Sequence, residues 1–157
     1  MDNQLYICPE FKKFQFDKVQ SLIQDVNERR SGGLWTSSYI PGKGSNWMLG
    51  PKFVREFVEY NKGYLFKVKS KANILHIKCY EDEEYFKKFY NSNPANVAKE
   101  FDALHLDIDY IEMIKAKFEQ SFFLFWSTES TWWFNVNNLE LLKVFDGREL
   151  KNMLIKN

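Results

Sequence analysis

The stretch from Trp126 to Phe134 places a single carboxylate among hydroxyl and indole side chains. It reads Trp-Ser-Thr-Glu-Ser-Thr-Trp-Trp-Phe, with Glu129 near its centre. Residues two apart share one face of a strand, so a strand here puts Ser127, Glu129 and Thr131 on the same side. A buried carboxylate needs hydrogen-bond donors, which the two hydroxyls can supply. Such carboxylates mark active sites, so Glu129 is the first candidate for chemistry, and a solvated Glu129 at a bend is the alternative.

A second segment, Gly32 to Tyr39, combines two glycines with hydroxyl and aromatic residues. It reads Gly-Gly-Leu-Trp-Thr-Ser-Ser-Tyr. Glycines permit either a close approach of the backbone to a ligand or a turn that other residues would strain. The pattern therefore predicts a strand from Leu34 that presents Trp35 and Tyr39 beside three hydroxyls. An ordinary Gly-Gly entry into a core strand is the alternative.

Two other sets of residues suggest chemistry less strongly. His76 and His105 lie in apolar alternations, but neither has the hydroxyl two residues later that a two-histidine phosphodiesterase uses. With only two histidines and no Cys-x-x-Cys pair, a structural zinc site is not expected. An acidic cluster could hold a divalent ion and serve a nuclease or phosphodiesterase, but lacks loop-type ligand spacing, so a solvated face is favoured. Its members are Asp102, Asp107, Asp109 and Glu112.

Composition limits the class of protein. The chain has 157 residues and a net charge of +1, with 15 Phe, 8 Tyr and 5 Trp. This length fits one domain, predicted over residues 1–157, and the neutral balance gives no global field for nucleic acid or anionic membranes. No apolar run approaches the ~20 residues of a membrane span, and the N-terminus has no signal-peptide pattern. Cys8 and Cys79 are predicted to be buried free thiols, and the localisation to be cytoplasmic.

Local patterns predict an α+β fold with mixed, mainly antiparallel sheets and inserted helices. Strands are expected over residues 5–8, 34–39, 64–68, 73–79, 103–108, 122–126 and 131–136, the last two being separate or one bent strand. Helices are expected over residues 16–26, 51–58, 81–90 and 94–101, with a small amphipathic piece ending at residue 155. The segment that ends at Phe118 is ambiguous between strand and helix.

Several of these motifs together resemble a family of small uncharacterised bacterial and phage proteins. They are the Gly-Gly-Leu-Trp-Thr-Ser-Ser run, a helix at Trp47, the Asp-Ala-Leu-His-Leu strand from Asp102 and the Trp126–Phe134 strand. The layout over residues 5–140 also resembles the ADP-ribosyltransferase fold. That fold has a short first strand, a second strand with Ser or Thr, a helix, and a catalytic Glu on a late strand.

The resemblance implies an NAD-dependent activity, either transfer of ADP-ribose or hydrolysis of NAD. Glu129 would be the catalytic carboxylate that hydrogen-bonds the nicotinamide ribose and stabilises an oxocarbenium-like transition state. Ser37, with Thr36 as runner-up, would support the catalytic geometry from the second strand. Aromatic residues would wall the nicotinamide slot, and the candidates are Trp35, Tyr39 and Trp47. NAD is thus expected as substrate, and no metal is expected.

Two positions differ from the pattern of that fold. The first strand, Leu5 to Cys8, has no Arg or His for the nucleotide, so Arg30 or its neighbour Arg29 would contact phosphate. Ser127 stands two residues before Glu129, where the fold often has a Gln or Glu that helps to choose the acceptor. A protein, a nucleic acid, a small molecule and water all remain open as acceptors.

The alternative function is that of a non-enzymatic phage or mobile-element accessory protein that binds and inhibits a host factor. Small size and aromatic richness favour it. It predicts no turnover and a large exposed aromatic patch. A membrane partner is not expected under either hypothesis.

Overall fold

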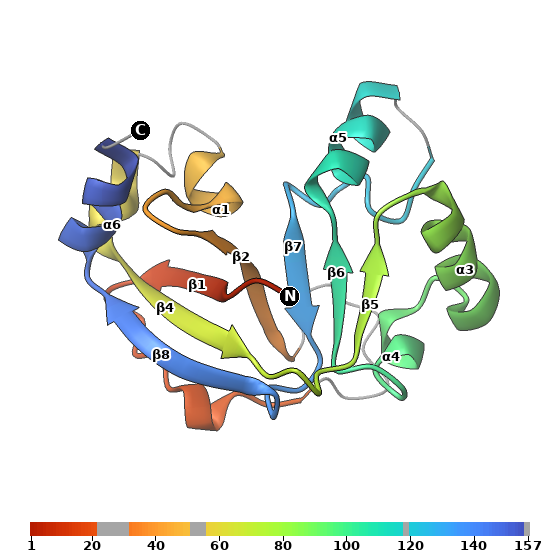
Figure 1. Cartoon of the computed structure of the whole chain (residues 1–157), viewed down its shortest axis with the longest axis horizontal. Helices are drawn as coiled ribbons and strands as arrows, with labels where there is room; N and C mark the ends of the chain where they lie inside the picture. The colour runs from red at the N-terminus through yellow and green to blue at the C-terminus, as the bar shows by residue number, and fades with distance from the viewer. Residues whose placement is uncertain (22–31, 51–55, 118–119, 156–157) are drawn as a thin grey trace. The chain divides into compact units, whose positions relative to one another are not determined.

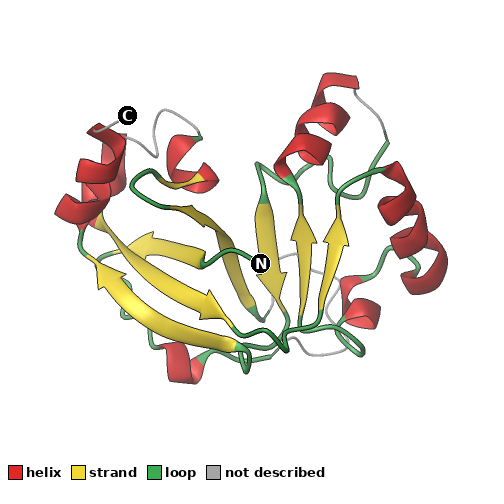
Figure 2. Ribbon diagram, in the orientation of Figure 1, coloured by secondary structure: helices red, strands yellow, loops and turns green. Residues whose placement is uncertain are grey.

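The computed structural model describes residues 1–21, 32–50, 56–117 and 120–155. The strand pairs within its two compact units are antiparallel except one, so the expected mixed α+β class is confirmed (Figures 1 and 2). Unit 1 comprises Met1–Lys18, Thr36–Ser70 and Asn138–Asn157, and unit 2 comprises Val19–Trp35 and Lys71–Asn137. The expectation of a single domain over residues 1–157 stays a prediction.

Unit 1 is an antiparallel sheet with short helices. Its strands are β1 (Gln4–Pro9), β2 (Leu34–Ile40, from Thr36 onward in this unit), β3 (Gly44–Ser45), β4 (Asn61–Val68) and β8 (Leu139–Phe145). The order is β2-β1-β4-β8, and β3 pairs with β2. Its helical elements are the 3-10 turns η1 (Phe16–Lys18) and η2 (Val58–Tyr60), and the helices α1 (Asn46–Leu49) and α6 (Gly147–Ile155).

The core of unit 1 forms where α6 contacts the sheet. Leu150 of α6 and Leu5 of β1 are fully buried, and both lie within reach of Gly63 in β4. The remaining buried members of this cluster are Met48, Val58, Leu65 and Phe145. Burying apolar side chains of this size stabilises the unit by about 1.5–3 kcal/mol each before the entropy cost.

Unit 2 is a three-stranded sheet with helices packed on it. Its elements are β5 (Ile74–Ile77), α3 (Tyr80–Tyr90), α4 (Pro94–Val97), β6 (Ala103–Leu106), α5 (Ile108–Lys117) and β7 (Ser130–Trp133). Strands β5 and β6 run parallel, because α3 and α4 return the chain between them, whereas β7 runs antiparallel to β6 (Figure 1).

Local sequence explains the ends of these helices. The first turn of α3 has three acids and its last turn two lysines, which complement the helix dipole, and Asn91 ends it in the left-handed conformation at φ 54°. The side chain of Asn93 accepts a hydrogen bond from the Ala95 N–H at the start of α4. The ambiguous segment before Phe118 is helical, and the Asp107 carboxylate accepts from the Asp109 N–H at its start.

Several predicted elements differ in the structure. The helix expected over 16–26 is a single 3-10 turn in its described part, and residues 22–31 lie outside the described residues, as do 51–55 of the next expected helix. Strand β8 was not predicted, because its five central residues are exposed and no alternation of burial marks it. Cys8 is buried as expected, but Cys79 is exposed, and both are free thiols.

The strand predicted over 122–126 is wrong, because residues 122–125 form a turn. The N–H of Phe122 donates to the Glu83 carboxylate, and the Phe123 N–H donates to the Ser121 hydroxyl. Phe123 and Trp126 are buried in the core of unit 2 rather than paired in a sheet. Among the described residues, no helix is long and apolar enough to cross a bilayer.

Candidate active site around Glu129

Strand register in unit 2 aligns three polar side chains in one row. His76 of β5 pairs with His105 of β6, which in turn pairs with Thr131 of β7. Directly opposed residues project from the same face of a sheet, so the three side chains lie next to one another. The two imidazole rings have centroids 5.4 Å apart.

The other face of the same strands is apolar, which fixes this alignment. The neighbours of the polar row are core residues beneath α3 and α5, namely Leu75, Ile77, Leu104, Leu106 and Trp132. A slip of one residue in any strand would expose this core and bury the histidines beneath the helices. The core thus holds the polar row in register.

Glu129 lies one residue before β7 and adjoins this row. Its Oε1 atom is 3.7 Å from Nδ1 of His105, and the same nitrogen lies 2.8 Å from the Thr131 hydroxyl oxygen. Glu129 is 3% exposed, His105 8% and Thr131 fully buried. The Thr131 hydroxyl is therefore the hydrogen-bond partner of this nitrogen, and the carboxylate lies just beyond hydrogen-bond distance. Glu129 thus lies at a bend, as the alternative had it, and β7 begins only at Ser130, but the carboxylate is buried beside an imidazole rather than solvated.

The second histidine of the row is held neutral by its surroundings. Burial, and then the neighbouring His105, lower the pKa of His76. The neighbouring His105 opposes protonation of His76, since the two rings lie on one face at short distance.

His76 makes the folded protein less stable toward acid. Above about pH 6.5 the imidazole is neutral in both folded and unfolded chains and adds no pH dependence. As the pH falls through that value, the unfolded chain takes up a proton that the folded protein resists, so the free energy of unfolding decreases. We expect Tm, measured by circular dichroism, to fall less between about pH 7.5 and about pH 5.5 in His76→Gln than in the unmodified protein. Equal decreases in the two proteins would contradict this.

The Thr131 hydroxyl is the nearest partner of His105, so its removal should be costly. Thr131→Val leaves a buried imidazole nitrogen without that partner and should lower the free energy of unfolding by about 1–3 kcal/mol. Thr128→Val is the matched control, because the half-buried Thr128 side chain has no hydrogen-bond partner among the described residues. Urea unfolding measures both variants, and equal stabilities would contradict the role of the bond.

Indole rings form a cluster in the same unit. Trp35, at the start of β2, stacks on Trp132 with centroids 4.8 Å apart at 18° and meets the edge of Trp126 at 4.7 Å. The Trp132 N–H donates to the Gly32 carbonyl. The N–H groups of Trp35 and Trp126 are buried and have no acceptor among the described residues. Two unsatisfied donors of this kind are compatible with an acceptor supplied by a ligand.

Thr36 and Ser37 belong to unit 1, where both are fully buried. The Thr36 hydroxyl donates to the Gln4 side-chain oxygen at 2.7 Å, and Ser37 pairs with Leu5 of β1. The Thr36 hydroxyl is thus satisfied by the fold of its own unit.

Tyr39 and Trp47 also belong to unit 1. Tyr39 is half-buried and stacks on Phe145 of β8 with centroids 6.0 Å apart. Trp47 lies half-buried in α1. Arg30 lies outside the described residues.

Ser127 lies outside the buried row, and in the acidic cluster Asp109 and Glu112 are exposed, as a solvated face predicts. The Ser127 side chain is exposed. The backbone carbonyl of Ser127, rather than its hydroxyl, accepts a hydrogen bond from the Lys115 ammonium. The Asp102 carboxylate accepts hydrogen bonds from the backbone N–H of Asn73 and from the side-chain amide of Asn135, so it stabilises the fold. Within the described ranges, no group of three or more His, Cys, Asp or Glu side chains is arranged to hold a metal ion.

The sequence did not indicate His105 as the partner of Glu129, because the contact depends on pairing between β6 and β7. The sequence did contain one hint of His105: it is the polar residue in the alternation Ala-Leu-His-Leu, so it lies on the face of the strand opposite the core. A search against family models, curated proteins and solved structures found no match for the chain.

Proposed function

We propose that the protein binds NAD and either transfers ADP-ribose to an acceptor or hydrolyses NAD, with Glu129 as the catalytic carboxylate. The observation that supports this most is the position of Glu129, 3% exposed, one residue before β7 and adjoining His105. Burial strengthens the field of a carboxylate, because fewer water molecules screen it. A fixed anion of this kind suits a reaction in which positive charge develops on a sugar.

In the proposed reaction, the bond between C1′ of the ribose and the nicotinamide nitrogen breaks. The bonding electrons leave with neutral nicotinamide, and the ribose acquires oxocarbenium character that the Glu129 carboxylate stabilises. An acceptor nucleophile, or water, then bonds to C1′ and loses a proton. His105 would orient the carboxylate through its Nδ1 atom, which lies 3.7 Å from Oε1.

The indole cluster lies with Trp132 on the core face of the sheet, opposite the row that Glu129 adjoins, so the slot expected at Trp35 stays a prediction. The Trp35 indole nitrogen is buried and has no acceptor among the described residues. The roles expected for Ser37, Thr36, Tyr39, Trp47, Ser127 and Arg30 remain predictions.

The direct test is incubation of the purified protein with NAD and chromatographic measurement of released nicotinamide. A parallel calorimetric titration measures NAD binding by itself, which separates an active enzyme from a binding protein without turnover. Nicotinamide release above the spontaneous rate supports the proposal. The absence of both release and binding would overturn it.

The alternative, a binding protein that inhibits a host factor, is favoured by exposed aromatic residues on α3. Tyr85 and Phe89 are 44% and 59% exposed, and their ring centroids are 4.6 Å apart. Exposed neighbouring rings are common at protein interfaces. This alternative predicts that a double change, Tyr85→Ser with Phe89→Ser, abolishes partner binding, and that NAD is not consumed.

A further inference from the structure

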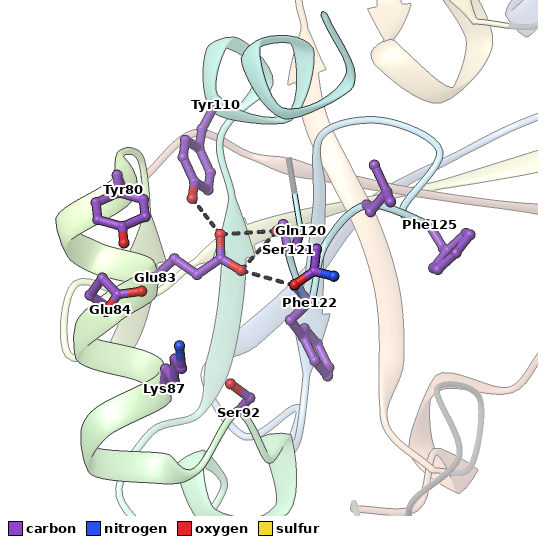
Figure 3. Close-up of a pocket in the computed structure, with 11 residues that line it drawn as sticks. Tyr80, Glu83, Glu84, Lys87, Ser92, Tyr110, Gln120, Ser121, Phe122 and Phe125 are labelled. Atoms are coloured by element: carbon purple, nitrogen blue, oxygen red, sulfur yellow. Dashed lines mark hydrogen bonds between the residues drawn. The ribbon is translucent and has the colours of Figure 1, made fainter. Parts of the chain in front are cut away.

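A cavity of 390 Å³ opens in unit 2, away from the row of His76, His105 and Thr131. It lies between α3, α5 and the turn at 121–125 (Figure 3). Its volume is at the lower end of the ~300–1,000 Å³ that is usual for ligand sites. Nothing in the proposed reaction uses it.

One wall of the cavity contains a buried carboxylate with neutral partners. Glu83 reaches from α3 toward Tyr110 and the turn, and it is 9% exposed (Figure 3). It accepts hydrogen bonds from the Tyr110 hydroxyl, the Ser121 hydroxyl at 2.8 Å and the Phe122 N–H at 2.9 Å. Among the described residues, no cationic group pairs with it. A buried charge with only neutral donors is an unusual state, because buried charges are normally paired.

The rim adds a second carboxylate that is available to a ligand. Glu84 is half-buried, lines the cavity, and has no hydrogen bond or ion pair among the described residues. The cationic group in the lining is Lys87, which is exposed. Two carboxylates and one ammonium give the lining a net negative charge.

Aromatic rings complete the lining. Tyr80 and Phe125 are 56% and 78% exposed, and Phe122 also lines the cavity. Aromatic faces attract cations by about 0.5–2 kcal/mol, and they also cover apolar stems. Negative charge with exposed rings selects a cation that carries apolar surface, and it disfavours anions and inorganic ions.

We propose that this cavity binds a small organic cation, an ammonium group on an apolar stem. The ammonium lies near the Glu83 and Glu84 carboxylates, and the stem lies against Phe125 and Tyr80. The ligand displaces water rather than protein, because the cavity is open in the structure. This site is independent of the proposed NAD chemistry.

The test is a titration of the isotope-labelled protein with n-butylammonium, followed by backbone amide shifts in NMR spectra. We expect saturable shifts at Glu84 and at residues 120–125, with a dissociation constant in the millimolar range for so small a probe. Neutral n-butanol and anionic butyrate, which share the stem, should give no saturable shifts there. Equal responses to all three probes, or butylammonium shifts spread over the whole chain, would overturn the proposal.

Two variants at the rim of the cavity test the proposed contacts with the ligand. They leave the hydrogen bonds to the buried Glu83 carboxylate unchanged. Glu84→Gln should raise the butylammonium dissociation constant by about fivefold, the effect of one charge at short range. Phe125→Ala should raise it by about two- to fivefold through loss of the ring. The controls are Glu112→Gln and Phe11→Ala, both exposed and outside the lining. Unchanged affinity in both test variants, or equal losses in the controls, would refute the assignment.

Discussion

Glu129→Gln should lower the rate of nicotinamide release from NAD by at least about 100-fold, the usual effect of removing one transition-state stabilising group. Glutamine keeps the size and hydrogen-bonding capacity of the side chain but removes the negative charge. The fold should persist, since a neutral amide can occupy the place of the carboxylate beside His105. Initial rates and circular dichroism spectra of the two proteins provide the measurement.

Two further variants show whether the loss of rate is due to the charge of Glu129. Glu112→Gln removes an exposed carboxylate of α5 and should keep full activity. Glu129→Asp keeps the charge but withdraws it by one methylene group, so it should retain part of the rate even if the glutamine variant folds poorly. Full turnover in a folded Glu129→Gln protein would show that another group performs the reaction.

Gly33→Ala should strongly destabilise the protein. Gly33 has φ +74°, and a Cβ atom built there would lie 2.2 Å from the Trp133 carbonyl oxygen and 2.9 Å from Nε1 of Trp132. The first contact is with backbone of β7, which cannot move without breaking the sheet. We expect a loss of more than about 3 kcal/mol in the free energy of unfolding, or failure to fold.

Gly42→Ala separates the clash from the backbone strain. Gly42 has the same φ of +74°, but a Cβ atom there would meet nothing within 4 Å. Its cost should be that of the left-handed conformation alone, about 1–2 kcal/mol. Urea unfolding of both variants measures the difference, and equal losses would show that contact with β7 is unimportant.

Elements with strong local signals were predictable from the sequence. Acids before lysines predicted α3, and the aromatic and hydroxyl run predicted β2, as the structure confirms. The prediction failed where tertiary contacts outweigh local preference. The aromatic run at 122–126 has high strand propensity, but the Glu83 carboxylate holds its start in a turn. Strand β8 exists because it pairs with β4, although only its two end residues are buried and the five between them are exposed.

The candidate site was predictable in part. The spacing of Glu129 and Thr131 predicted a shared face, and both side chains do approach His105. The identity of that partner was not predictable, because a contact between residues 24 and 26 positions apart depends on how β6 and β7 align. The hydrogen bonds to Glu83 could not be predicted from the sequence for the same reason, since their donors come from α5 and from the turn at 121–125.

The order of segments in the two units has a consequence for synthesis on the ribosome. Unit 2 has all of its residues once Asn137 has been made, whereas unit 1 still lacks Asn138–Asn157. Strand β4 therefore has its partner β1 but must wait for β8, which translation at ~5–20 residues per second delivers on the order of a few seconds after unit 2 is complete. During that interval one hydrogen-bonding edge of β4 is open to other chains. A released chain that ends after Asn137 should thus contain all residues of unit 2 but leave one edge of β4 in unit 1 open to aggregation.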